Sequence, residues 1–481
     1  MMVKENFRSN SMIALQALTD YLEDCENNQI PVIHQRHISE IISDLDLDQF
    51  VKDGGMSEVS LQKFLETYLE NTTRLHHRHY MAHQVSVPHT LGALGSFING
   101  VTNNAMAIYE MGPSATAIEF FMINWMLEKI GWTPSPIPGT ENTKHVQAYG
   151  GGVMTHGGSL ANLTALTAAR SAMFPDVWRD GNPGDIVVLV PEQSHYSLKR
   201  TIGIIGLGEK NCISMPADED GRVLPAQIPA LIDKLENNGK RIMAIVGNAC
   251  GTAAGLYDPL EEIGAICQER KIWFHVDAAH GAGAIVCEEY RHLVRGIRSA
   301  DSVIWDAHKM FRTPVLCAAV LVKDHHHIEH AFSQEASYLV HDKEQPGIDL
   351  MMRAVECTKS GLGLKMFLSL AAMGEKGLCD YISSRNRLAI DAANYINNLD
   401  DFECPVMPET CILCFRIGSD NRRQLEIRKI LLQNGHYYIS TTLYKNARWL
   451  RCVLINPDTT LDDLKGLFAE VRKINSELDQ N

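Results

Sequence analysis

Apolar and polar positions alternate in blocks along the middle of the chain. Short runs rich in β-branched and aromatic residues occur at four places: 185–190 (DIVVLV), 241–247 (RIMAIVG), 271–277 (KIWFHVD) and 302–306 (SVIWD). Helical patterns separate them, for example at 224–239 and 258–271. Strands that are apolar on both faces and alternate with helices indicate a mainly parallel sheet covered by helices, an α/β architecture. Ligands of such sheets bind at the carboxyl ends of the strands.

The two ends of the chain follow other patterns. An N-terminal region is helical with polar faces, and the last hundred or so residues return to helix before two strand-like runs at 411–418 and 448–456. We therefore predict an N-terminal helical segment (1–85), a large α/β domain (86–375) and a small C-terminal α+β domain (376–481).

Composition narrows the class of protein. A formal charge of −14 over 481 residues argues against a surface for nucleic acid or anionic membranes, because both require clustered Lys and Arg. No apolar run approaches the ~20 residues needed to cross a bilayer. Residues 1–25 are typical of an amphipathic helix rather than a signal peptide. Twelve scattered cysteines without an export signal favour reduced thiols and a cytoplasmic location.

The first candidate for chemistry is the stretch 151–170, GGVMTHGGSLANLTALTAAR. Gly157 and Gly158 let the backbone approach a ligand closely, and Ser159 can cap the helix that follows. A helix amino terminus with free N–H groups is a ready phosphate site. A tight turn with an ordinary helix cap would explain the same residues without a ligand.

Two charged residues follow buried strands. Asp277 closes one strand, so its carboxylate should lie at the ligand edge, where a protonated pyridine nitrogen would be a suitable partner; Ala278 and Ala279 leave room for a flat ring. Lys309 stands between two apolar runs, and its amine is tolerable there as an imine with an aldehyde. The alternatives are a loop-capping Asp277 and a Lys309 that reaches solvent or pairs with Asp306.

An anion site, a carboxylate and an amine are together what pyridoxal 5′-phosphate (PLP) requires. The sequence also resembles the group II PLP-dependent decarboxylases of fold type I, the family of glutamate, cysteine-sulfinate, 2,4-diaminobutyrate and aromatic amino acid decarboxylases. Five motifs carry the resemblance: HGGSLANLTAL (156–166), PEQSHYSLKR (191–200), NACGTAAGLYDP (248–259), HVDAAHGAG (275–283) and SVIWDAHKM (302–310).

The resemblance implies a role for each cofactor residue. Lys309 would form the Schiff base, and Asp277 would pair with the ring nitrogen and keep it protonated. His195 would stack on the ring, and Thr252 would lie near the 3′ oxygen. The remaining predicted cofactor residues are the phosphate ligands and the ring neighbour: Gly158, Ser159, His308 and Ala279.

On the substrate side, the resemblance implies that Arg451 takes the α-carboxylate, for which a planar bidentate donor is suited, and that Gln84 faces the substrate. The expected reaction is decarboxylation of a small L-amino acid, acidic (glutamate, aspartate) or short diamino (2,4-diaminobutyrate). The resemblance also implies a homodimer with shared active sites.

The loop after the lysine departs from the family pattern. Its only tyrosine, Tyr338, aligns with an earlier tyrosine of the family, and the position of the proton-donating tyrosine holds Gln345 or Pro346. His341 is a conceivable substitute acid. An oxidative deaminase or aldehyde synthase, or another fold type I lyase, is therefore the alternative activity, and a catalytically silent homologue is the alternative from another class.

Two histidine-rich stretches, 74–80 and 325–330, raise the question of a metal. Neither combines ligand spacing with a carboxylate in a convincing context, so we expect no metal site. The expected partner is a small-molecule amino acid, with no nucleic acid and no membrane.

Overall fold

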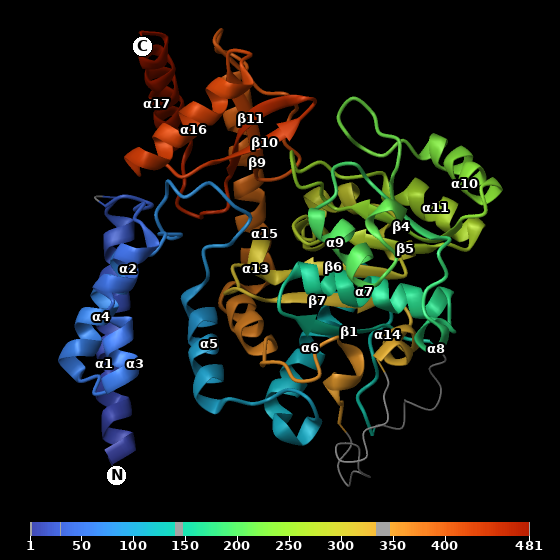
Figure 1. Cartoon of the computed structure of the whole chain (residues 1–481), viewed down its shortest axis with the longest axis horizontal. Coiled ribbons are helices and arrows are strands. Elements are labelled where there is room, and N and C mark those ends of the chain that lie inside the picture. Colours follow the sequence, from blue (N-terminus) through green and yellow to red (C-terminus); the bar gives the residue numbers. More distant parts are fainter. Residues whose placement is uncertain (1, 29, 140–147, 333–346, 481) are drawn as a thin grey trace. The chain divides into compact units, whose positions relative to one another are not determined.

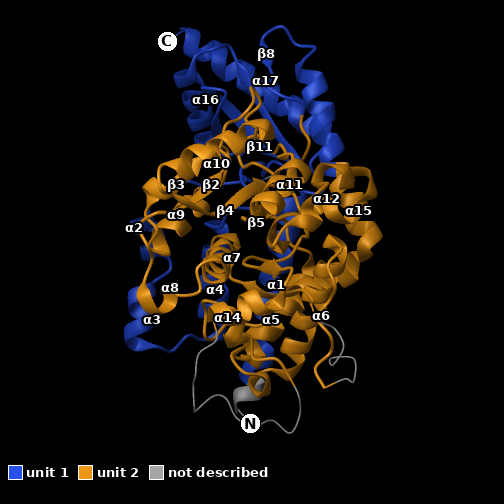
Figure 2. Cartoon of the chain, turned by 90° about the vertical axis from the view of Figure 1, so that its right-hand side faces the viewer, with its two compact units in different colours: residues 1–83, 385–407, 411–481 blue, residues 84–384, 408–410 orange. Residues whose placement is uncertain are grey.

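The structure is a computed structural model that describes residues 2–28, 30–139, 148–332 and 347–480. Their contacts form two compact units (Figure 2). Unit 1 comprises residues 1–83, 385–407 and 411–481, and unit 2 comprises 84–384 and 408–410. The division into segments 1–85, 86–375 and 376–481 stays a prediction.

Unit 2 is built on a seven-stranded sheet with strand order β1-β7-β6-β5-β4-β2-β3 (Figure 1). Its strands are β1 (Gly151–Thr155), β2 (Ile186–Val190), β3 (Cys212–Ser214), β4 (Arg241–Asn248), β5 (Trp273–Asp277), β6 (Ser302–Asp306) and β7 (Ala318–Val322). The pairs from β3 through β6 are parallel, whereas β7 runs antiparallel to both β6 and β1. The predicted mainly parallel α/β sheet of fold type I is confirmed.

Helices pack on this sheet, and α7 (Gly158–Met173) crosses β1, β7, β6, β5 and β4. Other helices with close contacts to the sheet include α6 (Pro113–Ile130), α10 (Ile228–Asn237), α11 (Leu260–Arg270), α13 (Ala307–Met310) and α14 (His325–Phe332). Further elements of unit 2 are α5 (Thr90–Thr102), α8 (Val177–Asp180), α9 (Tyr196–Ile204) and α12 (Gly283–Val286). The long α15 (Gly363–Ile396) is kinked at Gly374.

Local sequence explains where two of these elements begin. The helix expected at 224–239 starts as α10 only at Ile228, after a 3₁₀ turn at Pro225–Gln227, because prolines are accommodated in a first turn and not in a helix interior. The strand expected from 271 starts at Trp273, because Lys271 adopts a left-handed conformation that ends the preceding helix.

Unit 1 combines helices with a small antiparallel sheet of strand order β10-β11-β9-β8. The strands are β8 (Phe402–Glu403), β9 (Ile412–Ile417), β10 (Ser440–Tyr444) and β11 (Ala447–Val453). The helices are α1 (Met2–Glu26), α2 (Ile38–Asp44), α3 (Leu47–Asp53), α4 (Glu58–Glu70), α16 (Asn421–Asn434) and α17 (Leu461–Gln480), and α1 packs against α4.

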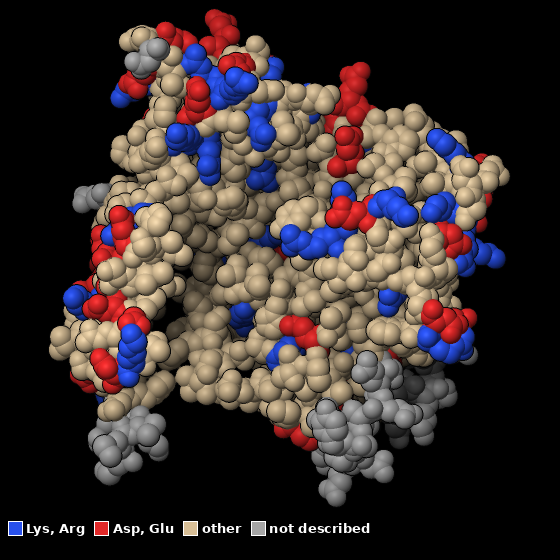
Figure 3. Space-filling view, in the orientation of Figure 1, with Lys and Arg blue, Asp and Glu red and all other residues tan. Residues whose placement is uncertain are grey.

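Within the described ranges, no helix is both long and apolar enough to span a bilayer. On the face drawn in Figure 3, basic and acidic side chains are interspersed rather than gathered by sign. That face therefore lacks the broad basic surface on which a phosphate backbone binds.

Candidate active site

A cavity of about 320 Å³ in unit 2 brings most of the predicted site residues together. The predicted residues that line it are Gln84, Gly158, Ser159, His195, Thr252, Asp277, Ala279, His308 and Lys309. A larger cavity of about 650 Å³ lies in unit 1 beside α1 and α4, and none of the predicted residues lines it. The smaller cavity is the candidate site because the predicted residues, Asp277 and Lys309 among them, line it.

Two predicted residues are not in this cavity lining. Arg451 is a buried residue of β11 in unit 1, paired in register with Cys414 and Ser440. His341 lies outside the described residues. The roles of both stay predictions.

Sheet topology explains why the cavity lies where it does. Asn248 and Asp277 are register partners at the ends of the parallel strands β4 and β5, and Asp306 ends the neighbouring β6. Parallel strands present their carboxyl ends at one edge of a sheet, where their last side chains meet. Lys309 follows in the short helix α13, directly after β6.

The glycine turn before α7 is fitted closely to its surroundings. Gly157 has a φ of +102°, which favours glycine, and α7 begins at Gly158. A Cβ at Gly158 would lie 2.6 Å from Asp306 Oδ2, so this position has no room for a side chain. Ser159 follows in the first turn, where free backbone N–H groups and the helix dipole favour an anion.

Lys309 is held by a buried carboxylate. Its Nζ lies 3.3 Å from Asp306 Oδ2, while the side chain of Asp306 is only 2% exposed. The alternative in which Lys309 pairs with Asp306 is thus realised, and Lys309 lines the cavity at the same time. Among the described residues, Asp306 Oδ1 has no hydrogen-bond partner.

His308 packs beside this pair. Its Nδ1 lies 2.9 Å from the carbonyl oxygen of Cys317, and its Nε2 lies 3.7 Å from Asp306 Oδ2. Burial lowers the pKa of His308. The neighbouring carboxylate opposes that shift.

The carboxylate of Asp277 accepts hydrogen bonds at both oxygens. Oδ1 accepts from the backbone N–H of Ala279 at 3.2 Å, and Oδ2 accepts from Asn162 Nδ2 at 3.0 Å. Asn162 lies on α7, one turn after the glycine turn, and also lines the cavity. Asp277 is therefore fixed from two sides, with its remaining lone pairs available to a ligand.

His195 stands at the N-cap of α9. Its Nδ1 accepts from the backbone N–H of Ser197 at 3.2 Å and lies 2.8 Å from Ser197 Oγ. Burial lowers the pKa of His195, so the neutral imidazole is favoured at neutral pH. A neutral ring is suited to stacking on a flat heterocycle.

These residues fit PLP. The glycine turn brings the first backbone N–H groups of α7 to the cavity, where a phosphate can bind, and Lys309 supplies an amine for the aldehyde. Asp277 supplies a carboxylate for a ring nitrogen. Each functional group of the cofactor thus has a chemically matching group in one cavity.

Sequence reasoning assigned no role to two further histidines of this cavity, His156 and His280. His156 lines it, with Nδ1 2.5 Å from Glu356 Oε1 and Nε2 2.7 Å from Ser360 Oγ. Glu356 and Ser360 lie some 200 residues further along the chain. The quoted motif contains His156, but no local pattern signals partners so distant.

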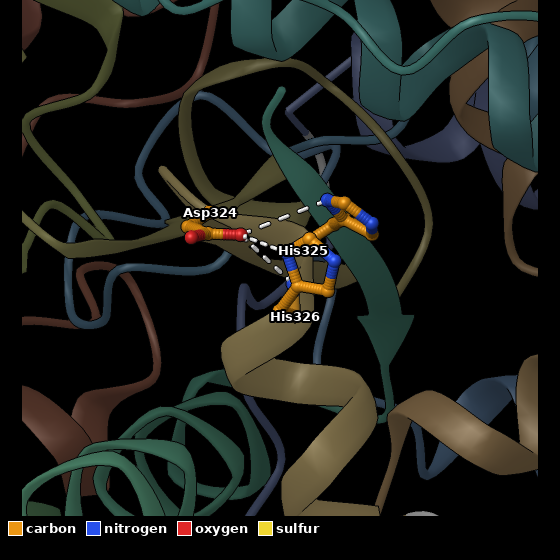
Figure 4. Close-up of side chains that lie close together, drawn as sticks. All are labelled: Asp324, His325 and His326. Carbon is orange, nitrogen blue, oxygen red and sulfur yellow. Dashed lines mark hydrogen bonds and ion pairs between the residues drawn. The ribbon is translucent and has the colours of Figure 1, made fainter. Parts of the chain in front are cut away.

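The stretch 325–330 forms the start of α14. Figure 4 shows Asp324, His325 and His326 close together, with their possible ligand atoms within 4.8 Å of one another. Asp324 Oδ1 accepts from the backbone N–H of His326 at 3.0 Å and lies 2.8 Å from its Nδ1. This is the geometry of a helix N-cap. The expectation of no metal stays a prediction.

The sheet and the cavity define a PLP-dependent enzyme of fold type I. Residues 54–418 match the family described as "Pyridoxal-dependent decarboxylase conserved domain". The chain therefore belongs to the group II PLP-dependent amino acid decarboxylases, as the resemblance predicted, and it is a PLP-dependent carboxy-lyase.

Individual proteins agree with this placement. The chain is 24% identical to the acidic amino acid decarboxylase GADL1 of Xenopus tropicalis, over 90% of this chain and 86% of that protein. It is 26% identical to the L-2,4-diaminobutyrate decarboxylase of Acinetobacter baumannii, over 87% of this chain and 84% of that protein. The crystal structure of mouse CSAD superposes with a TM-score of 0.87 at 23% identity, covering 97% of this chain and 98% of that one.

Proposed function

We propose that this enzyme decarboxylates a small acidic or short diamino L-amino acid, giving the amine and carbon dioxide. The observation that carries the proposal is the meeting of Lys309, Asp277 and the glycine turn in one cavity. The two relatives named above, an acidic amino acid decarboxylase and an L-2,4-diaminobutyrate decarboxylase, support this substrate class.

In this proposal, bound PLP withdraws electrons from the substrate bond that breaks. Lys309 would hold the cofactor through its side-chain amine. Asp277 would keep a proton on the ring nitrogen, and His195 would pack on the ring face. Thr252 would contact the 3′ oxygen, and Ala279 would leave room for the ring.

The phosphate ligands in the proposal are Gly158, Ser159 and His308. Arg451 takes the substrate α-carboxylate and so selects which bond is aligned for cleavage, and Gln84 contacts the substrate. His341 remains the proposed proton donor to the substrate Cα.

We further propose a cytoplasmic homodimer with shared active sites. Support for a reducing compartment comes from the cysteines: all twelve lie in the described residues and none forms a disulfide. Sedimentation of the holoenzyme tests the dimer, and a monomer with full activity would contradict it.

The decisive experiment traps the cofactor on the chain. Purified holoenzyme is reduced with borohydride, and peptide mass analysis should place the modification on Lys309; Lys309→Ala should carry none and lose turnover by at least about 10³-fold. Lys365→Met is the control, because Lys365 is a buried lysine of unit 2 that donates to the Val315 carbonyl and does not line the cavity. Modification elsewhere in the wild type would refute the assignment.

Product analysis separates the activities. Holoenzyme is incubated with the common amino acids and with 2,4-diaminobutyrate, and amine, carbon dioxide, ammonia and peroxide are all measured. Amine equal to carbon dioxide supports the proposal. Ammonia and peroxide formed together with an aldehyde would instead establish the oxidative alternative, which the loop sequence at 333–359 motivates.

A further inference from the structure

A chain of buried hydrogen bonds lies behind Asp277, and none of its members was predicted to function. The chain links Trp273, Ser302, His275 and Asn162, and each of them is at most 3% exposed. The distances are 2.8 Å for Trp273 Nε1 to Ser302 Oγ, 2.8 Å for His275 Nδ1 to Ser302 Oγ, and 2.8 Å for His275 Nε2 to Asn162 Oδ1.

The direction of every bond follows from Asp277. An ionised carboxylate only accepts, so the amide nitrogen of Asn162 must face Asp277 Oδ2 and its oxygen must face His275. His275 Nε2 must then carry a proton. Burial lowers the pKa of His275 to about 4, so the ring is neutral and its Nδ1 accepts from the Ser302 hydroxyl. Ser302 in turn accepts from Trp273.

The same amide has a second branch toward the cavity. Asn162 Nδ2 also donates to Ser197 Oγ at 3.0 Å, and Ser197 Oγ lies 2.8 Å from His195 Nδ1. Since the serine oxygen receives the amide proton, its own proton is directed to His195 Nδ1. A neutral His195 must therefore carry its proton on Nε2.

We propose that Asn162 and His275 are positioning residues for the reaction: one oriented hydrogen-bond chain fixes both the Asp277 carboxylate and the tautomer of His195. A buried amide in this place could rotate and present its oxygen to Asp277. His275 prevents that rotation, because its Nε2–H requires an acceptor. The inference rests on the proposed pairing of Asp277 with the ring nitrogen.

The test compares two ligands of the apo-protein: PLP, and its carbocyclic analogue in which C–H replaces the ring nitrogen. The readout is the ratio of their dissociation constants. Asn162→Ala should weaken PLP by about tenfold or more, since a hydrogen bond to a charged group is lost, and should change the analogue by less than about twofold. A purely structural role would weaken both ligands equally.

Variants of His275 repeat the test without touching the amide. His275→Leu removes the donor and should reduce the ratio as Asn162→Ala does. His275→Gln can place an amide nitrogen near the Nε2 position and should restore the ratio. If Asn162→Ala does not fold, this pair alone decides, and equal ratios for Leu and Gln would overturn the proposal.

Two controls separate the possible failures. Asn211→Ala removes another buried amide of unit 2, which donates to the Leu207 carbonyl away from the cavity, and should leave the ratio unchanged. Asp277→Ala should abolish the preference for PLP. If it does so while Asn162→Ala and His275→Leu do not, the positioning role is wrong. If Asp277→Ala leaves the preference intact, the pairing of Asp277 itself is wrong, and the inference falls with it.

Discussion

Asp277 and Asp306 end the neighbouring parallel strands β5 and β6, and both line the same cavity, but their hydrogen bonding differs. Both Asp277 oxygens accept hydrogen bonds. Asp306 Oδ2 contacts Lys309 Nζ. Among the described residues, no donor bonds to Asp306 Oδ1. A buried acceptor without a donor costs about 1–3 kcal/mol. Both oxygens of Asp277 are thus fixed by neighbouring residues, whereas Asp306 is fixed at one oxygen.

The largest expected effect is a difference in kcat/KM between variants of Asp277 and of Asp306. Asp277→Ala removes the charge proposed to face the ring nitrogen, and we expect kcat/KM to fall by about 10³-fold. Asp306→Ala should cost about tenfold or less, because Lys309 itself remains. Steady-state kinetics of both variants, each saturated with PLP, provide the measurement. Equal losses would remove the distinction.

The next effect concerns the fit between Asp306 and the glycine turn. Gly158→Ala places a methyl group against both carboxylate oxygens, at 2.6 and 2.9 Å, and should weaken PLP about tenfold or more. Adding Asp306→Ala should restore part of the affinity by removing the clash, which titration of the apo-protein with PLP would detect. Gly203→Ala is the control, because its nearest neighbour is 3.9 Å away. Additive losses in the double variant would contradict this account.

A smaller effect is expected in the pH dependence of protein stability, which His275 behind Asp277 influences. The pKa of folded His275 is about 4, below the ~6.5 of an unfolded histidine, so the unfolded chain binds one more proton between these values. Protonation of His275 in the unfolded chain therefore lowers the free energy of unfolding as the pH falls from about 6.5 to about 4, by up to about 3 kcal/mol. His275→Gln lacks it, and its thermal midpoint should fall less from pH 7 to pH 5. His436→Gln removes an exposed histidine and should follow the wild type.

The smallest effect belongs to a partly exposed carboxylate. Asp324→Ala removes the N-cap of α14 and should cost about 1 kcal/mol, seen as a small drop in the thermal midpoint with PLP affinity unchanged. Dialysis against a chelator should change neither the midpoint nor turnover. A loss of activity that added divalent metal restores would show that Asp324, His325 and His326 hold an ion.

The sequence predicts the residues of the site that stand next to a strand end or a helix start. Asp277 and Lys309 are of this kind, since Asp277 ends a buried strand and Lys309 lies three residues after the next one, so sheet geometry brings them to the same edge. Gly158 is predicted by its place before a helix. Local pattern and topology rules are sufficient for all three.

What the sequence does not predict depends on pairings across long separations. The bonds from Asn162 to Asp277 and to His275 span 115 and 113 residues, and no period in the sequence encodes them. The direction of β7 is a similar case, because only the packing makes it antiparallel to β6. Likewise, only contacts reveal that residues 1–83 belong to the same compact unit as 411–481.

The helix α7 carries Ser159 in its first turn and Asn162 one turn further, about 4.5 Å along the axis. A single turn of helix moves as a rigid body, so a shift at one of these residues is transmitted to the other. A substitution that displaces the start of α7 is therefore expected to disturb both the proposed phosphate contact at Ser159 and the hydrogen bond from Asn162 to Asp277.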